Sequence, residues 1–170
     1  LESEPSLEFK ALHPAYQNIR KKSGREDLLL AWQKGETGLP FVDACMRCLR
    51  TTGWMNFRMR AMLVAVASYH LWLDWRGTGE YLARLFTDYE PGIHWSQMQM
   101  QSGTTGINTI RIYNPVKQGQ DQDPETKFVR RWIPELGAVP ADFLHQPWLW
   151  DGAASVLDKS YPFPVIDHLE

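Results

Sequence analysis

The side chains that could do chemistry in this 170-residue chain are arginines, indoles and a few carboxylates, and they gather around one apolar stretch. Trp54, Arg58 and Arg60 lie at its start, and Asp74-Trp75-Arg76 closes it. Two guanidinium groups at the mouth of a buried helix, with indoles at both of its ends, indicate a place that holds a large aromatic anion.

The arginines near this stretch stand in windows without acids, although the whole chain has a formal net charge of −2. Between positions 44 and 73 there are four arginines and no carboxylate, and between 91 and 120 Arg111 and Lys117 are the only charged residues. The rest of the chain therefore has twelve cations against twenty acids. A local positive face that binds phosphate is compatible with a slightly acidic protein, and the alternative is an uneven distribution that arose by chance.

Several kinds of chemistry lack the motifs that they need. There is no serine nucleophile elbow, no glycine-rich phosphate loop followed by lysine, and no HExxH zinc motif. Cys45 and Cys48 have CxxC spacing, but a structural metal site needs four ligands and the sequence has no second cysteine pair. We therefore expect no metal site and interpret both cysteines as small side chains in a reducing compartment.

The ends of the chain differ from its middle. Residues 1–24 are polar and irregular, which is typical of a linker or a loosely packed lead-in. Leu169-Glu170 is interpreted as a cloning scar, so residues 25–168 are expected to form the ordered domain. The sequence has no signal peptide and no apolar run of about eighteen residues, which favours a soluble cytoplasmic protein with no contact to a membrane.

The pattern of apolar residues predicts five or six helices and at most one strand, so the expected fold class is all-α. A short helix is expected over 27–34 and closes at Gly35, and a second helix runs from Pro40 to Gly53. Asn56 can cap a third helix, whose apolar residues continue to Leu73.

The second half of the chain is less regular in its pattern. The glycines after Trp75 predict a break before a fourth helix over 80–88. Residues 94–120 are expected to be the least regular ordered part, with Ile110-Arg111-Ile112 as a possible short strand. A last clear helix is predicted from Asp123-Pro124 to Ile133, and the tail beyond it is expected to wrap the surface.

Several short segments occur in an order and spacing that are specific to one family. Over residues 28–150 the chain resembles the C-terminal half of the FAD-binding domain of photolyases and cryptochromes. The matching segments are Ala31–Gly38, Val42–Ala44, Met46–Arg47, Thr52–Met55, Arg58–Arg60, Asp74–Arg76, Arg111–Pro115 and Trp132–Leu136. The resemblance implies an irregular all-helical domain that holds a folded FAD, with a DNA groove above the flavin in photolyases.

The resemblance also implies a light-driven reaction. In photolyases, excited reduced flavin donates an electron to a cyclobutane pyrimidine dimer in the pocket, and the electron returns after the ring opens. The implied parent enzyme is a deoxyribodipyrimidine photo-lyase, a carbon–carbon lyase whose partner is DNA with pyrimidine dimers. The family's N-terminal antenna domain and the first half of the flavin domain are missing from this chain. We therefore expect the fragment to bind FAD weakly or not at all and to be inactive alone.

The resemblance implies a set of residues around the flavin. Trp54 and Phe57 are expected at the flavin pocket, with Phe57 in place of an asparagine that is common in the family. Arg60 is expected to pair with Asp88 beside the isoalloxazine ring, and an ordinary structural ion pair is the alternative. Glu90 stands where the family usually has a second aspartate near the polar edge of the flavin.

His94 takes the place of the asparagine that faces the reactive nitrogen of the flavin in this family. A histidine there could tune proton uptake by the reduced flavin, and a satisfied pocket residue is an equally good interpretation. Trp75 matches one of the three tryptophans of the family's electron-transfer relay. Trp72 and Trp95 are candidates for another route.

The remaining residues are implied to face DNA. Arg58 and Arg111 match positions that contact phosphate or the flipped lesion, and solvated arginines are the alternative. Met100 falls near a tryptophan that stacks on the lesion, and Ala61 stands where repair enzymes place a methionine. Three functions stay open: a repair photolyase, which we favour, a cryptochrome blue-light receptor, and a non-catalytic helical binding module.

Overall fold

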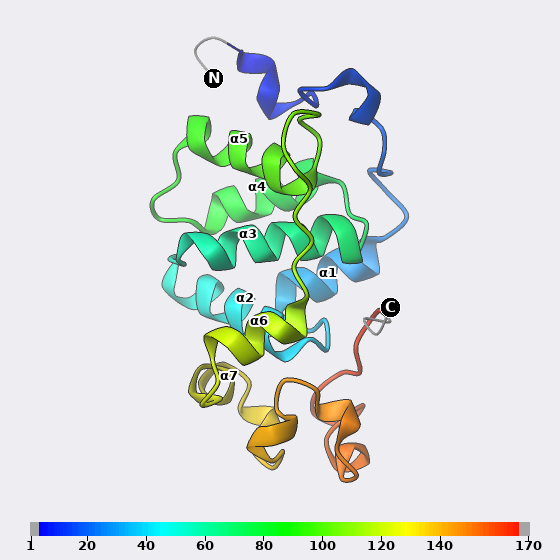
Figure 1. Ribbon diagram of the computed structural model, residues 1–170, viewed down its shortest axis with the longest axis vertical. Coiled ribbons are helices and arrows are strands. Elements are labelled where there is room, and N and C mark those ends of the chain that lie inside the picture. Colours follow the sequence, from blue (N-terminus) through cyan, green and yellow to red (C-terminus); the bar gives the residue numbers. More distant parts are fainter. Residues whose placement is uncertain (1–3, 167–170) are drawn as a thin grey trace.

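The computed structural model describes residues 4–166 as a stack of helices joined by short loops (Figure 1). No strand is formed within these residues, and the all-α fold class is confirmed. The predicted cloning scar lies outside the described residues. The α-helices are α1 Glu26–Lys34, α2 Pro40–Thr52, α3 Phe57–Ala65, α4 Trp75–Leu85, α5 Pro91–Ser102, α6 Pro115–Gln122 and α7 Lys127–Trp132.

The helices are stacked along the long axis of the molecule, and their order in the stack differs from their order in the chain. Figure 1 shows α5 and α4 towards the end that carries the lead-in, and α3 in the middle. α2 packs against α6 and α7 towards the opposite end. A π-helical segment, Val66–His70, extends α3, and the tail beyond residue 140 folds into short 3-10 turns.

Local signals place the first three helices where the sequence predicts them. Gly35 and Gly53 end α1 and α2 in the left-handed conformation, with φ of 69° and 71°, which glycine adopts without steric cost. The Asn56 side chain accepts a hydrogen bond of 3.1 Å from the backbone N–H of Met59. This bond satisfies one of the free N–H groups at the beginning of α3.

The predicted break between the third and fourth helices is placed too late: the chain is non-helical over 71–74, and α4 runs without interruption from Trp75 to Leu85 rather than over 80–88. Asp74 caps this helix by accepting a bond of 3.0 Å from the backbone N–H of Arg76. Gly79 packs against Trp95, and a Cβ at this position would lie 2.6 Å from the indole ring. The glycine therefore allows close packing within a helix and does not end it.

The prediction of an irregular stretch over 94–120 is wrong for most of its length. Both α5 and α6 begin with a proline that follows a capping residue, Glu90 for α5 and Asn114 for α6. The side chains of α5 are mostly Gln, Ser and Met, so the helix lacks a clear apolar period. Ile110-Arg111-Ile112 forms no strand, and α7 begins at Lys127 rather than at Asp123.

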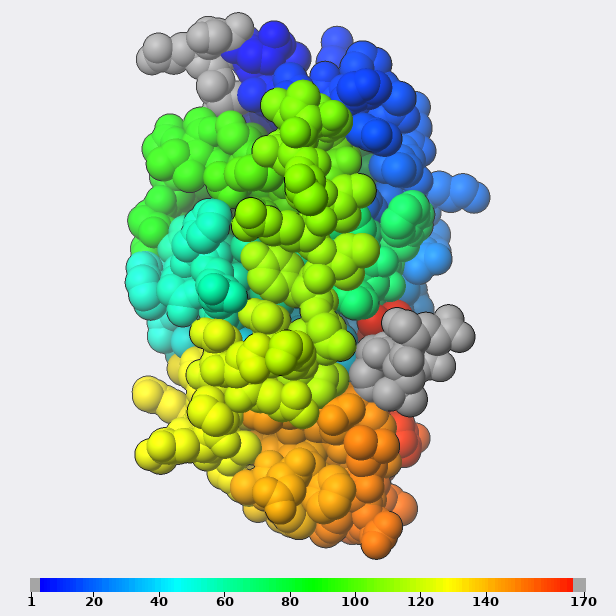
Figure 2. All heavy atoms as spheres, viewed as in Figure 1, coloured from blue at the N-terminus to red at the C-terminus, as the bar shows by residue number. Residues whose placement is uncertain are grey.

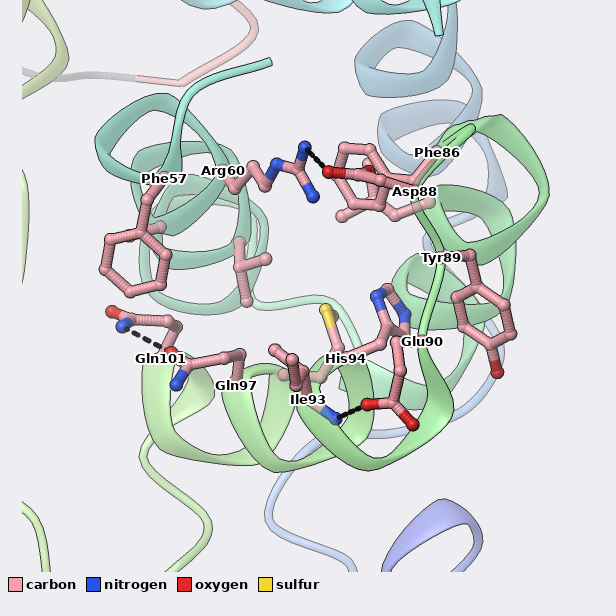
Figure 3. Close-up of a pocket in the computed structure, with 14 residues that line it drawn as sticks. Phe57, Arg60, Phe86, Asp88, Tyr89, Glu90, Ile93, His94, Gln97 and Gln101 are labelled. Atoms are coloured by element: carbon pink, nitrogen blue, oxygen red, sulfur yellow. Dashed lines mark hydrogen bonds and ion pairs between the residues drawn. The ribbon is translucent and has the colours of Figure 1, made fainter. Parts of the chain in front are cut away.

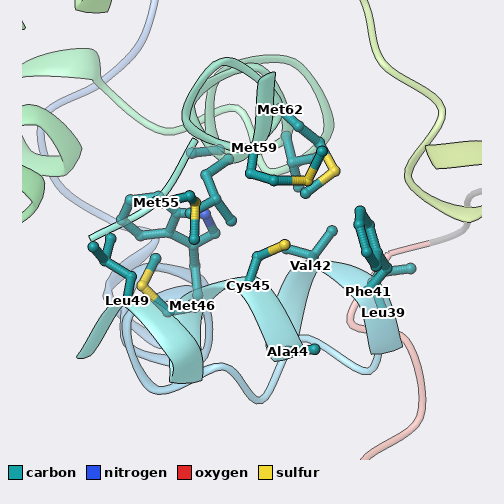
Figure 4. Packing of buried hydrophobic residues seen from close by; sticks show 14 of the residues in the cluster. Leu39, Phe41, Val42, Ala44, Cys45, Met46, Leu49, Met55, Met59 and Met62 are labelled. Atoms are coloured by element: carbon teal, nitrogen blue, oxygen red, sulfur yellow. The ribbon is translucent and has the colours of Figure 1, made fainter. Parts of the chain in front are cut away.

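The hydrophobic core is centred on α2 and α3 (Figure 4). Cys45 and Met46 of α2 are fully buried, and Met59 and Met62 of α3 lie opposite them. Flexible methionine side chains fill the irregular gaps between helices that cross at an angle. Cys45 and Cys48 are free thiols, and no cluster of potential metal ligands occurs among residues 4–166.

The irregular lead-in before α1 is attached to the helices that follow it in the stack. Gln99 of α5 donates bonds of 2.7 Å to the carbonyl oxygens of Leu7 and Lys10, and its Oε1 accepts one of 2.7 Å from the N–H of Leu12. Arg76 of α4 donates to two further carbonyl oxygens of the lead-in. Irregular secondary structure is thus combined here with a defined set of hydrogen bonds.

One face of the molecule carries an extended connection between α5 and α6. Figure 2 shows this segment, 103–114, crossing over the helices below the lead-in. Ile107, Ile110 and Ile112 on it are exposed. In the described part of the chain, no helix has both the length and the apolar character that crossing a bilayer requires.

Candidate functional site

A hollow lies between α3, α4, α5 and the loop that joins α4 to α5 (Figure 3). It encloses about 160 Å³, and its walls are mostly apolar. Its titratable side chains include Arg60 from α3, Asp88 and Glu90 from the loop, and His94 from α5. An apolar hollow with a few converging polar groups is typical of a small-molecule site.

Arg60 and Asp88 form an ion pair at this hollow, with Nη2 and Oδ2 2.8 Å apart. Arg60 Nε also donates a bond of 2.7 Å to the carbonyl oxygen of Met55, and the guanidinium lies 4.1 Å from the centre of the Phe86 ring. The hydrogen bond from Arg60 holds the pKa of Asp88 below its ordinary value. Within residues 4–166, Arg60 Nη1 donates no hydrogen bond and Asp88 Oδ1 accepts none from another residue, so both atoms can bind a ligand.

Glu90 fixes the beginning of α5. Its carboxylate oxygens accept bonds of 3.1 and 2.7 Å from the backbone N–H groups of Gly92 and Ile93. These bonds, the one from Ile93 first, lower the pKa of Glu90. The positive end of the helix dipole favours the same charge. Glu90 is therefore ionised at the hollow, and each of its oxygens already has one partner.

His94 is a buried histidine whose pKa is lowered by burial. The bond to Gly79 opposes this effect, and the charge of Arg60 reinforces it. The Nε2 atom lies 2.9 Å from the carbonyl oxygen of Gly79. Because a carbonyl oxygen can only accept, Nε2 carries the proton, and Nδ1 of the neutral ring is left as an acceptor. The hollow therefore contains a neutral imidazole of defined tautomer.

A series of aromatic rings leads away from the hollow. The ring centre of His94 lies 5.0 Å from that of Trp95, which in turn lies 6.0 Å from that of Trp75. Trp95 Nε1 donates a bond of 3.1 Å to the hydroxyl of Tyr89 at the rim of the hollow. Trp75 and Trp95 are both buried. The closely spaced rings form a continuous path from the hollow into α4.

Trp54, which the resemblance implies at the flavin pocket, does not line this hollow. Its side chain is 58% exposed and lies beside a separate hollow that includes Cys48 and Phe128. Three residues further on, Phe57 does line the hollow, because the first turn of α3 directs it there. The structure therefore brings together Phe57, Arg60, Asp88, Glu90 and His94, and it leaves Trp54 apart.

The residues expected to face DNA lie outside this hollow. Arg58 and Arg111 are exposed and have no ion-pair partner within the described residues, while Met100 is partly buried on α5. Two of the four arginines between positions 44 and 73 are paired in the fold with acids from other parts of the chain. Arg47 is paired with Glu135 and Arg60 with Asp88, so Arg58 keeps a charge that is free to meet phosphate.

Sequence reasoning missed one wall of the hollow. Ile93, Gln97 and Gln101 of α5 all line it. Residues four positions apart share one face of a helix, so their spacing is the signal that could have found them. That signal is usable only once α5 is known to be a helix.

The whole chain, residues 1–170, matches the family of FAD binding domains of DNA photolyase, and the chain belongs to this family. It is 34% identical over 172 aligned positions to the deoxyribodipyrimidine photo-lyase of Alkalihalophilus pseudofirmus, an alignment that covers 97% of this chain and 36% of that protein. It is 40% identical over 145 positions to the enzyme of the same name from Escherichia coli, with 84% of this chain and 30% of that protein covered.

Solved structures show the same likeness. The archaeal photolyase from Sulfolobus tokodaii, described with two FAD molecules, matches with a TM-score of 0.86 and 32% identity. The match covers 98% of this chain and 37% of the photolyase chain. A bacterial class III photolyase from Agrobacterium tumefaciens has a TM-score of 0.87 and 30% identity, with 96% and 35% covered. The chain thus spans about a third of the length of these relatives.

FAD is the cofactor of this family, and the hollow fits part of it. Complete ligand pockets usually enclose about 300–1,000 Å³, whereas this hollow encloses about 160 Å³. The ion pair, with one free donor on Arg60 and one free acceptor on Asp88, matches a planar ring that has polar edges. The hollow is therefore too small for the whole cofactor, but its donor and acceptor suit one edge of such a ring.

Proposed function

We propose that this domain is part of a light-driven DNA repair enzyme that uses FAD to split cyclobutane pyrimidine dimers. The observation that carries the proposal is the Arg60–Asp88 ion pair, 2.8 Å long, at an apolar hollow in a member of the photolyase FAD-binding family. When FAD is bound and reduced, it supplies the photochemical electron. The role of the protein is to hold the cofactor and the lesion and to exclude water.

Three residues of the hollow have distinct roles in this proposal. Arg60 donates to the polar edge of the ring system, and Asp88 accepts from it. His94 presents a neutral Nδ1 acceptor, since burial keeps the imidazole uncharged. Together they place one donor and two acceptors around a flat apolar space.

Binding of FAD by this chain alone is proposed to be weak, because the hollow forms only one wall of the site. Titration of the 170-residue chain with FAD, followed by flavin fluorescence, tests this point. We expect no saturation at low micromolar FAD. A tight complex with one FAD per chain would contradict the proposal.

Trp75 is proposed as an electron-transfer relay together with Trp95. Support comes from the ring-centre separations of 5.0 Å between His94 and Trp95 and 6.0 Å between Trp95 and Trp75. In the full-length protein, Trp75→Phe is expected to slow light-driven reduction of the flavin at least tenfold, while FAD binding stays unchanged. An unchanged rate would remove Trp75 from the route.

The DNA partner is proposed to meet the arginines that the fold leaves unpaired. Arg58 and Arg111 are exposed, and phosphate contacts of this kind position a protein on DNA without reading its sequence. Substituting either arginine with alanine is expected to weaken binding to damaged and undamaged DNA alike and to make its salt dependence less steep. Met100 is proposed to lie near the bound lesion.

A cryptochrome light receptor is the second candidate, because Ala61 and Met100 replace residues that hold the lesion in repair enzymes. The chain is also 37% identical over 150 positions to Cryptochrome-2 of Arabidopsis thaliana, which covers 83% of this chain and 24% of that protein. Blue light on the reduced full-length protein with dimer-containing DNA separates the two functions. Recovery of intact thymines supports repair, and no recovery contradicts it.

The cytoplasm is the proposed location, and the free thiols of Cys45 and Cys48 support a reducing compartment. A non-catalytic helical module that binds nucleic acid or protein is the third candidate for the isolated chain. Steep salt dependence of DNA binding by the chain alone would favour that module, and absence of binding at low salt would remove it.

A further inference from the structure

Gln97 and Gln101 form an uncharged wall on the side of the hollow opposite the ion pair. They lie one helical turn apart on α5, and Phe57 from α3 lies next to Gln101 (Figure 3). Figure 3 also shows Arg60 and Asp88 across the hollow from these amides. The hollow therefore has one charged side and one side made of amides and an aromatic ring.

The two amides have most of their hydrogen-bonding capacity free. A primary amide has two N–H donors and an oxygen that accepts two bonds. Gln101 Nε2 lies 3.5 Å from Gln97 Oε1, which is long for a hydrogen bond and contributes little. No other bond of either side-chain amide occurs within residues 4–166. Each amide is thus free to donate and to accept at the same time.

Their neighbours favour a flat, uncharged ligand. Phe57 is 60% exposed and Ile93 is 66% exposed, so apolar surface flanks the amides at the mouth of the hollow. Large apolar side chains at this level of exposure offer a stacking surface for an aromatic ring. The charges of Asp88 and Glu90 are engaged by Arg60 and by the N-terminus of α5.

We propose that Gln97 and Gln101 recognise the ring edges of the two adjacent bases of a pyrimidine dimer, with Phe57 as the apolar surface beside them. This inference rests on the proposed function. A thymine has carbonyl oxygens next to its ring N–H, and a primary amide matches one such pair with one donor and one acceptor. Two linked bases present two such edges, and α5 presents two amides one turn apart.

The two residues then discriminate the dimer from undamaged DNA. An undamaged strand is held mainly by phosphate contacts, which these amides do not make. Loss of one two-bond contact to a base weakens recognition of that base about tenfold. We therefore expect each glutamine to contribute to the preference for dimer DNA, and little to general DNA affinity.

The test uses the full-length flavin-loaded protein with the variants Gln97→Ala, Gln101→Ala and the double variant. The probe is a short single-stranded oligonucleotide with one thymine dimer, and the reference is the same oligonucleotide without damage. Binding is measured in the dark by fluorescence anisotropy, and flavin content is read from the visible absorption spectrum. Gln120→Ala is the matched control, because Gln120 is exposed on α6 and away from the hollow.

We expect each single variant to lose about tenfold in affinity for the dimer probe, with affinity for the reference changed less than twofold and flavin content unchanged. Equal losses on both probes, or no loss on either, would overturn the inference. Loss of flavin from the variants would assign the amides to the cofactor and overturn it as well. If the unaltered protein shows no preference for the dimer probe, the proposed repair function fails together with the inference.

Discussion

Two arginine–carboxylate pairs of equal length lie in different parts of this molecule. Arg47 and Glu135 are 2.8 Å apart where α2 meets the segment after α7, and Arg60 and Asp88 are 2.8 Å apart at the hollow. Arg47 Nε also donates to the carbonyl oxygen of Gly35, and Nη1 donates to that of Trp132. Asp88 has a side chain that is 50% exposed, compared with 28% for Glu135.

The difference teaches how a structural pair and a binding pair can be distinguished. In the Arg47 pair both carboxylate oxygens of Glu135 accept from Arg47, and Nε and Nη1 of Arg47 are engaged within the fold, so the pair joins elements. The Arg60 pair keeps one donor and one acceptor free and borders an apolar hollow. Unused hydrogen-bonding capacity beside a hollow, rather than the ion pair itself, distinguishes the Arg60 pair as a candidate binding site.

The carboxylates near the two arginines also differ in how they titrate. Near Arg47, the buried carboxylate of Asp43 accepts bonds from the backbone N–H and hydroxyl of Thr37, from the N–H of Gly38 and from the hydroxyl of Tyr161. Burial outweighs these bonds and raises the pKa of Asp43 to about 6, whereas Arg60 lowers the pKa of Asp88. Asp43 and Asp88 therefore contribute to the pH dependence of stability with opposite signs.

The largest effect is expected from Asp43. Because its pKa is higher in the folded chain than in the unfolded chain, its stabilising contribution is complete below pH 4 and is lost as the pH rises through about 6. A shift of this size corresponds to about 3 kcal/mol in the free energy of unfolding. Denaturant titrations between pH 4 and pH 7.5 measure it as the difference between the unaltered chain and Asp43→Asn. Parallel pH profiles for the two proteins would contradict the assignment.

A second prediction concerns the structural pair. Arg47→Met removes the bonds to Glu135, Gly35 and Trp132, and leaves Glu135 partly buried without its partner. We expect the free energy of unfolding to fall by about 2 kcal/mol, below the range for fully buried pairs because both side chains keep some contact with water. Arg50→Met is the control, since Arg50 is exposed, and a change within about 0.5 kcal/mol is expected there. Equal losses in the two variants would remove the special role of Arg47.

The pair at the hollow should matter less for stability. Arg60→Met leaves Asp88 half-exposed, so water replaces the lost partner. A loss of less than about 1 kcal/mol in the free energy of unfolding is expected, again from denaturant titration. A loss as large as that of Arg47→Met would show that both pairs are structural and would end the distinction between them.

The smallest effect is expected at Trp54. Its side chain is 58% exposed and does not border the hollow, so Trp54→Ala should change the free energy of unfolding by no more than about 0.5 kcal/mol. FAD content of the full-length protein is expected to stay the same. Loss of the flavin in this variant would place Trp54 back in the site.

Local signals in the sequence predicted much of the fold. The ends of α1 and α2 at Gly35 and Gly53 and the cap of α3 at Asn56 depend on neighbouring residues alone, and all three are confirmed. The prediction that Gly79 marks a break is wrong. This position is a glycine because Trp95 of another helix packs closely against it. Such a contact cannot be read from composition or period.

The site was predictable only in part for the same reason. The structure brings Arg60 and Asp88 together as the family resemblance implied. The charge count could not show that Glu135 neutralises Arg47, since the two residues meet only after α2 and α7 pack together. The wall of Gln97 and Gln101 was hidden because α5 has no apolar period that would predict a helix.

The most direct test of the account compares matched carboxylate variants from the two pairs in the full-length protein. FAD content per chain is measured from the visible absorption spectrum after purification of Asp88→Ala and Glu135→Ala. We expect Asp88→Ala to lose most of its flavin, and Glu135→Ala to keep its flavin and to be only less stable. Full flavin content in Asp88→Ala, or equal loss in both variants, would contradict the claim that the Arg60–Asp88 hollow is the flavin site.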